Sequence, residues 1–175
     1  MYQLRFPIGE FLEPQEYPVS LINTWIKEID ELPVQLQTEA GHLNELQLNT
    51  PYRPEGWTLR QVIHHIADSH LNSFIRFKLA LTEENPTIKP YFEERWANLP
   101  DYSMPVQVSF QLLVHLHARW VHLLFSLTQQ DLNKTYYHPE NKREFTLQYA
   151  IGLYAWHGKH HLAHIQSLKK RQGWD

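Results

Sequence analysis

Apolar residues recur at the three- and four-residue spacing of amphipathic helices in four long segments of this chain. The segments run from Val19 to about Leu48, from Thr58 to about Leu81, from Pro105 to about Leu127 and from Thr146 to about Arg171. No alternating pattern bounded by turn residues predicts a strand, and no internal repeat is present. We therefore expect an all-α fold, a four-helix bundle with long loops between the helices.

Local signals mark where several of these helices begin and end. Thr58 and Gln61 form a capping box at the start of the second helix. Thr146 is the expected N-cap of the last helix, and Gly173 follows its end. Pro33 is expected to break or kink the first helix.

The length of the chain predicts a single domain. Its 175 residues fall within the usual size of one domain, so residues 1–175 are taken as one helical bundle. Residues 1–17 contain Pro7, Gly9 and Pro14 and are expected to form an irregular N-terminal arm. Residues 82–103 are a long loop, of a kind that often serves function.

Composition narrows the classes of partner. The net charge of −3 argues against nucleic acid or an anionic membrane, both of which favour a basic face. The absence of cysteine excludes disulfides and thiolate metal ligands. No signal peptide is recognised, and histidines and an arginine interrupt the most apolar segment, 110–127. We expect a cytoplasmic protein that acts on small molecules, and a homodimer is compatible with the sequence.

Two clusters of histidines carry the chemistry of the chain. The first lies on the second helix and contains His64, His65 and His70, with Asp68 among them. The second lies on the last helix and contains four histidines, His157, His160, His161 and His164. Histidines four residues apart on a helix point the same way, as two ligands of one metal ion must. A third ligand would come from another helix of the bundle.

Helical geometry distinguishes the two possible pairs on the last helix. At about 100° per residue, His161 lies roughly 40° and His157 roughly 80° from the centre of the apolar face. His160 lies roughly 140° away, on the side expected to face solvent. His157 and His161 are therefore the predicted inward pair, with His164 between the two orientations. On the second helix the same reasoning does not decide whether His64 or His65 is the third ligand, because the two flank the apolar face at similar angles.

Several stretches of the sequence resemble the YfiT-like branch of the DinB superfamily. They are Thr50-Pro51-Tyr52-Arg53-Pro54 with Gly56-Trp57-Thr58, the run His64 to His70, Ile75-Arg76-Phe77-Lys78, Tyr137-His138-Pro139 and Trp156-His157 through His164. The resemblance implies a four-helix bundle that holds a metal ion with three histidines. Carried over by motif, these are His65, His157 and His161. Many relatives have Gly-Gln where this chain has Ala163-His164.

The resemblance also implies two alternative activities. Members of this branch are described as metal-dependent hydrolases or as thiol S-transferases that use bacillithiol. We expect one divalent ion, zinc or nickel, with a thiolate attacking an electrophile. The alternatives are hydrolysis by metal-bound hydroxide and a non-catalytic bundle stabilised by metal. Asp68, His138 and Arg119 are weaker candidates for further roles near the metal.

Overall fold

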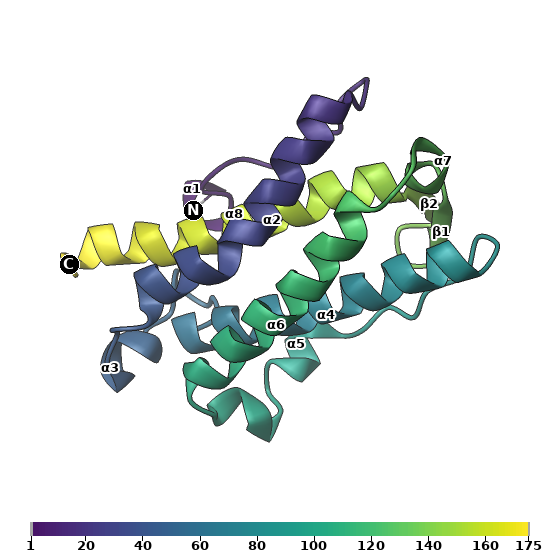
Figure 1. Ribbon diagram of the computed structural model, residues 1–175. Coiled ribbons are helices and arrows are strands. Elements are labelled where there is room, and N and C mark those ends of the chain that lie inside the picture. The colour runs from purple at the N-terminus through teal and green to yellow at the C-terminus, as the bar shows by residue number, and fades with distance from the viewer. Residues whose placement is uncertain (1, 175) are drawn as a thin grey trace.

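Four long helices dominate the computed structural model, which describes residues 2–174 (Figure 1). They are α2 (Val19–Ala40), α4 (Leu59–Thr82), α6 (Val106–Phe125) and α8 (Leu147–Gln172). Helices α2 and α4 each pack against both α6 and α8. Consecutive long helices α2 and α4 therefore lie diagonally across the bundle, as do α6 and α8. The predicted four-helix bundle is confirmed.

The predicted caps set the starts of the two helices that carry the histidines. Thr58 Oγ1 accepts a hydrogen bond from the Gln61 backbone N–H at 3.2 Å, and Gln61 Oε1 accepts one from the Thr58 N–H at 3.0 Å. Thr146 caps α8 by accepting from the Tyr149 N–H at 3.2 Å. At the other end of α8, Gly173 takes a left-handed φ of 65°, which glycine adopts without strain.

Of the two outcomes predicted at Pro33, a break or a kink, the break does not occur. Helix α2 continues through Pro33 from Val19 to Ala40. A proline inside a helix removes one N–H and leaves the carbonyl four residues earlier without its partner. That carbonyl belongs to Ile29, and it accepts a hydrogen bond from His117 Nδ1 of α6 at 2.6 Å. A contact from another helix thus satisfies the group that the proline releases.

Short elements fill the connections. They are α1 (Tyr2–Arg5), α3 (Glu45–Leu48), α5 (Glu93–Trp96), the 3₁₀ helix η1 (Pro100–Ser103), α7 (Gln129–Leu132) and an antiparallel hairpin of β1 (Thr135–His138) and β2 (Arg143–Thr146). The expectation of no strand is therefore wrong. Each strand has four residues, too few for an alternating pattern to stand out.

The N-terminal segment is more ordered than the irregular arm predicted from its prolines and glycine. It contains the turn of helix α1 and packs against α8. Trp156 of α8 donates from its indole nitrogen to the Gly9 carbonyl at 3.2 Å. This segment covers one side of α8 next to its histidines. Within residues 2–174, no helix combines the length and the apolar character needed to cross a bilayer.

Candidate metal centre

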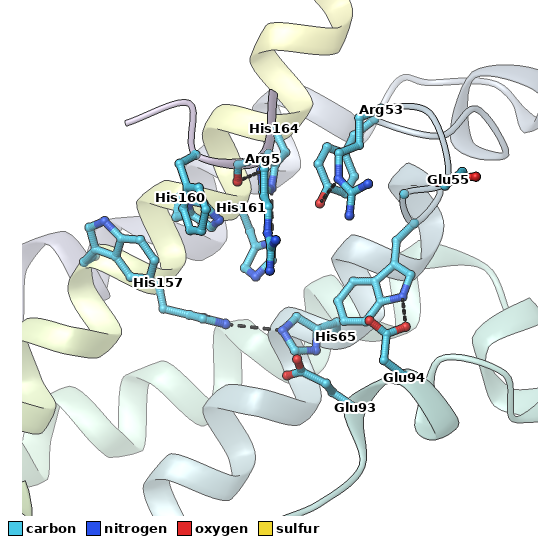
Figure 2. A pocket seen from close by; sticks show the side chains of 15 residues that line it. Arg5, Arg53, Glu55, His65, Glu93, Glu94, His157, His160, His161 and His164 are labelled. Atoms are coloured by element: carbon cyan, nitrogen blue, oxygen red, sulfur yellow. Dashed lines mark hydrogen bonds between the residues drawn. The ribbon is translucent and has the colours of Figure 1, made fainter. Parts of the chain in front are cut away.

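His65, His157 and His161 meet between α4 and α8 (Figure 2). One nitrogen of each ring lies within 4.8 Å of the others. His65 Nε2 and His157 Nε2 are 3.3 Å apart. Ligands of a tetrahedral zinc ion with Zn–N bonds of about 2.05 Å stand about 3.3 Å from one another. The three side chains named from the sequence therefore converge at a spacing that suits one metal ion.

The three rings are neutral near pH 7, as metal ligands must be. Burial lowers the pKa of His65 to about 4. Burial, and after it the neighbouring histidines, lowers the pKa of His157 and of His161 well below 6.5. Each ring therefore keeps a lone pair available, and no proton has to leave before a cation binds.

A chain of hydrogen bonds runs from His157 through the interior to α2. His157 Nδ1 lies 3.2 Å from His70 Nε2, and His70 Nδ1 lies 3.0 Å from His117 Nε2. The chain ends at the Ile29 carbonyl, which His117 Nδ1 contacts. It links all four long helices, because these residues come from α8, α4, α6 and α2 in turn.

The carbonyl at the end of this chain determines which nitrogen of each ring carries the proton. A carbonyl only accepts, so His117 carries its proton on Nδ1. The pKa of His117 is lowered to about 4, mainly by burial, so its Nε2 is an unprotonated acceptor. His70 then donates from Nδ1 and accepts at Nε2 from His157 Nδ1. The Nε2 of His157 is left with a lone pair that faces His65 and His161.

A second, shorter chain acts on His161. His164 Nε2 lies 3.0 Å from the carbonyl of Arg5 in α1, and His164 Nδ1 lies 3.4 Å from His161 Nδ1. Burial is the main cause that lowers the pKa of His164 to about 4, so this ring is neutral. His164 donates to the carbonyl and accepts from His161. The Nε2 of His161 is therefore the nitrogen with the free lone pair.

His65 completes the cluster without such a chain. Its Nδ1 is buried and has no hydrogen-bond partner among residues 2–174. The indole of Trp57 packs against the ring, with centroids 4.6 Å apart, and donates to Glu94 at 3.2 Å. Because Nδ1 engages no neighbour, no hydrogen bond fixes the tautomer of His65, and the ring can present the Nε2 lone pair to a cation beside His157 Nε2. The donor set thus fits a divalent ion held by three neutral imidazoles.

A cavity of about 280 Å³ opens over the three histidines. Figure 2 shows Arg5 and Arg53 on one side and Glu93 and Glu94 on the other. Glu93 is exposed overall, and partial desolvation of its carboxyl at the cavity wall raises the pKa of this group, with Glu94 and Glu140 raising it further. A carboxylate with a raised pKa can take up a proton from a reacting group. The cavity therefore combines the three nitrogens, room for a small molecule and a proton acceptor.

Comparison with known proteins assigns the chain to a family. The family model described as the DinB superfamily matches residues 28–165, a range that includes all three clustered histidines. The chain belongs to the DinB superfamily. Within this superfamily, proteins of Bacillus cereus and Bacillus thuringiensis are 58% identical over 174 residues, covering 99% of this chain and all of theirs. YfiT from Bacillus subtilis is 46% identical, with a TM-score of 0.96 and 99% of each chain covered.

The names of these DinB-superfamily relatives concern metal-dependent hydrolysis. The Bacillus cereus and Bacillus thuringiensis proteins are named as candidate metal-dependent hydrolases. YfiT is described as a probable metal-dependent hydrolase with an unusual four-helix bundle topology. In this chain, the diagonal placement of α2 and α4 gives a bundle in which consecutive long helices are not always neighbours.

His64, which periodicity could not separate from His65, lies away from the cluster in this DinB-superfamily chain. Its Nδ1 is 2.7 Å from Ser109 Oγ of α6, and its Nε2 is 3.1 Å from the Met104 carbonyl. Because the carbonyl can only accept, Nε2 carries the proton and donates it in the hydrogen bond. Nδ1 therefore accepts from the serine hydroxyl. Both nitrogens are occupied, and neither has a lone pair for a metal.

His160 contradicts its predicted exposure to solvent. Only 7% of its surface is accessible, and its ring stacks on Trp156 with centroids 4.6 Å apart. Phe6 of the N-terminal segment lies on the same ring, at 5.8 Å. Helical periodicity identifies only the face of α8 that packs on the other long helices, whereas the N-terminal segment covers a further face. His160 lines the cavity but does not join the cluster of three.

The remaining candidates have other partners. Asp68 accepts a hydrogen bond from the Tyr102 hydroxyl at 2.7 Å. Arg119 is exposed and stacks on Phe74, and it lines a different cavity from the one over the histidines. His138 lines a second cavity that His157 also borders. Glu93 was not a candidate from the sequence, because nothing in its long loop indicated that a turn of helix would bring it to the histidines.

Proposed function

We propose that this protein is a metal-dependent enzyme that binds one divalent ion, zinc or nickel, through Nε2 of His65, His157 and His161. The observation that supports this most strongly is the pair of hydrogen-bond chains ending at the Ile29 and Arg5 carbonyls. They direct a lone pair of each α8 histidine toward the same point. The names of the relatives agree with a role for a metal ion.

The proposed reaction is attack of a small thiol on an electrophile, in which the sulfur bonds to the electrophilic carbon as the bond from that carbon to its leaving group breaks and the group departs as an anion. A divalent ion with three neutral ligands keeps its full charge and lowers the pKa of a thiol or water at an open position. Because the three ligands are neutral, the positive charge of the ion favours an anionic partner such as a thiolate. Glu93, which lines the cavity and has a raised pKa, is the proposed acceptor of the thiol proton. Bacillithiol is the thiol expected from the family resemblance.

Hydrolysis is the second candidate, and two observations favour it. The relatives are named for hydrolysis, and Glu93 supplies the general base that such a reaction needs. The open cavity over the histidines gives less support to a purely structural metal, since structural sites usually close with a fourth protein ligand.

Turnover of matched substrates distinguishes these reactions. Metal-loaded protein would be assayed with a chromogenic electrophile and a series of thiols, bacillithiol among them, and separately with ester and amide substrates. We expect thiol conjugation well above the protein-free rate, lost after chelation and in His161→Ala. If thiol conjugation proceeds only at the protein-free rate while ester or amide hydrolysis depends on the metal, the proposed activity becomes that of a hydrolase.

A further inference from the structure

Helix α4 buries two arginines to the same degree but provides partners for only one. Arg60 and Arg76 are 6% and 7% exposed. Arg60 contacts Glu45, Asn49 and the Met104 carbonyl through its three nitrogens, at 2.6, 3.2 and 2.9 Å. For Arg76, the hydrogen bond found among residues 2–174 joins one nitrogen to the Tyr154 hydroxyl at 3.3 Å, and no carboxylate forms an ion pair with it.

Most of the Arg76 side chain is buried, whereas the guanidinium nitrogens that do not contact Tyr154 remain accessible from the adjoining cavity. Buried charges in proteins are normally paired or neutralised, and arginine remains charged at any physiological pH. Arg60 shows how a structural arginine is accommodated in this helix, with a carboxylate and two further acceptors around its guanidinium. Arg76 has no carboxylate partner among residues 2–174, so its charge is available to an anion from outside the chain.

The Arg76 side chain lines a cavity of about 180 Å³ beside the histidine cluster. His157 and Glu93 border both this cavity and the one over the three histidines. A ligand whose anionic end lies against Arg76 therefore has its other end close to His157. The volume accommodates a carboxylate with a few carbon atoms, not a whole drug-sized molecule.

A second donor faces the same cavity. His138 of β1 is buried, and its Nδ1 accepts a hydrogen bond from the Asn141 backbone N–H at 3.4 Å. In the neutral ring the proton is then on Nε2, which is free to donate. Burial, and after it the Arg76 charge, lowers the pKa of His138, so the ring stays neutral near pH 7. The guanidinium and this N–H make the cavity a site for oxygen acceptors.

We propose that this cavity is a subsite for a carboxylate group of the substrate, with Arg76 as its charged anchor and His138 as a neutral donor. The Arg76 fork matches the two oxygens of a carboxylate. Glu93 and Glu140 also line the cavity, and their charges disfavour a phosphate dianion relative to a singly charged carboxylate. The subsite deepens the proposed function, since it assigns a carboxylate-bearing substrate to the same metal site.

Binding can be tested without metal or turnover. Sodium propionate would be added to chelator-treated full-length protein at constant ionic strength, with proton–nitrogen NMR signals of Arg76 and the His138 ring as reporters. We expect a saturable shift that sodium chloride does not produce. In Arg76→Gln the His138 shift should be lost, and in Arg76→Lys binding should weaken roughly tenfold or more, because the lysine cannot form the paired contact. Arg119→Gln, which removes an exposed guanidinium, should bind propionate as the wild type does.

Kinetics separate this inference from the proposed function. In Arg76→Gln, the KM of a carboxylate-bearing thiol such as mercaptopropionate should rise more than that of an uncharged thiol, while metal content is unchanged. No saturable shift in the wild type, unchanged propionate binding in Arg76→Gln, or tighter binding of inorganic phosphate than of propionate would each overturn the carboxylate subsite. A protein that binds propionate but conjugates no thiol would instead overturn the transferase and leave the subsite standing.

Discussion

His64 and His65 are adjacent on α4 but lie in two different regions of the bundle. His64 faces α6, where Ser109 and the Met104 carbonyl occupy both of its nitrogens. His65 faces α8, where Nδ1 has no partner and Nε2 lies 3.3 Å from His157. A buried histidine can therefore bind a metal only if its neighbours leave the lone pair of one ring nitrogen unoccupied. Burial alone does not distinguish the two, at 6% and 2% exposure.

The same contrast separates His70 and His117 from the α8 histidines. Both nitrogens of His70 and of His117 are hydrogen-bonded, so neither ring has a free lone pair. Their contribution is to fix the proton of His157 on the nitrogen away from the cluster. The interior of the bundle therefore orients the site that opens between α4 and α8.

The largest expected effect is loss of the metal ion when a histidine of the cluster between α4 and α8 is removed. His65→Ala should empty the site, because it removes one of the three proposed ligands, whereas His64→Ala should retain about one metal ion per chain. On α8, His157→Ala and His161→Ala should lose the ion and His160→Ala should retain it. Elemental analysis of each purified variant measures the outcome.

Circular dichroism and thermal unfolding of the same variants control for folding. Metal retained in His65→Ala but lost in a folded His64→Ala variant would reverse the assignment on α4. Loss in His160→Ala with retention in His157→Ala would place the α8 ligands three residues away from our assignment.

Acid should destabilise the metal-free protein strongly. Burial lowers the pKa of His65 and of His117 from 6.5 to about 4. Below pH 6.5 the unfolded chain therefore binds protons that the folded chain does not. Stability is fully present above that pH and falls as the pH decreases toward 4, by up to about 1.4 kcal/mol per pH unit for each fully buried histidine. Urea unfolding of chelator-treated protein across this range measures it, and a flat profile would show that the histidines are not held neutral.

Breaking the interior chain should weaken the metal site without removing a ligand. In His117→Phe, His70 loses its acceptor and His157 is no longer held in one tautomer. We expect metal affinity to fall roughly 10- to 100-fold, the usual effect of removing a group that orients a ligand. Competition with a chelator measures the affinity, and His64→Phe, an equally large change outside the chain, is the matched control. Equal metal affinity in both variants would mean that the hydrogen bonds through His70 and His117 have no part in positioning His157.

The smallest effect is expected at the end of that chain. Pro33→Ala restores a backbone N–H that competes with His117 for the Ile29 carbonyl. We expect a modest loss of metal affinity, less than that of His117→Phe, together with unchanged or greater helix stability. Paired chelator competition and thermal unfolding measure both quantities. A larger loss than in His117→Phe would indicate that Pro33 acts on the site by another route.

Much of this arrangement was predictable from local sequence signals. The periodicity, the capping box at Thr58 and Gln61 and the cap at Thr146 predicted the helices, and the four-residue spacing predicted the pair on α8. The different surroundings of His64 and His65 could not be predicted, because they depend on Ser109, which lies 45 positions from His64 on α6. The burial of His160 depends on Phe6 and the N-terminal segment, and the role of Pro33 depends on His117. In each case the deciding partner is distant in the sequence, where periodicity carries no information.

The central claim is that three Nε2 atoms form the site and that hydrogen bonds fix the lone pairs of two of them, on His157 and His161. Long-range proton–nitrogen NMR of the histidine rings tests it most directly. Spectra would be recorded for the metal-free protein and for the protein loaded with zinc. We predict that zinc shifts Nε2 of His65, His157 and His161, with His157 and His161 already protonated on Nδ1 before the metal is added. Coordination through Nδ1, or a direct metal shift on His64, His160 or His164 in place of one of the three, would contradict the account.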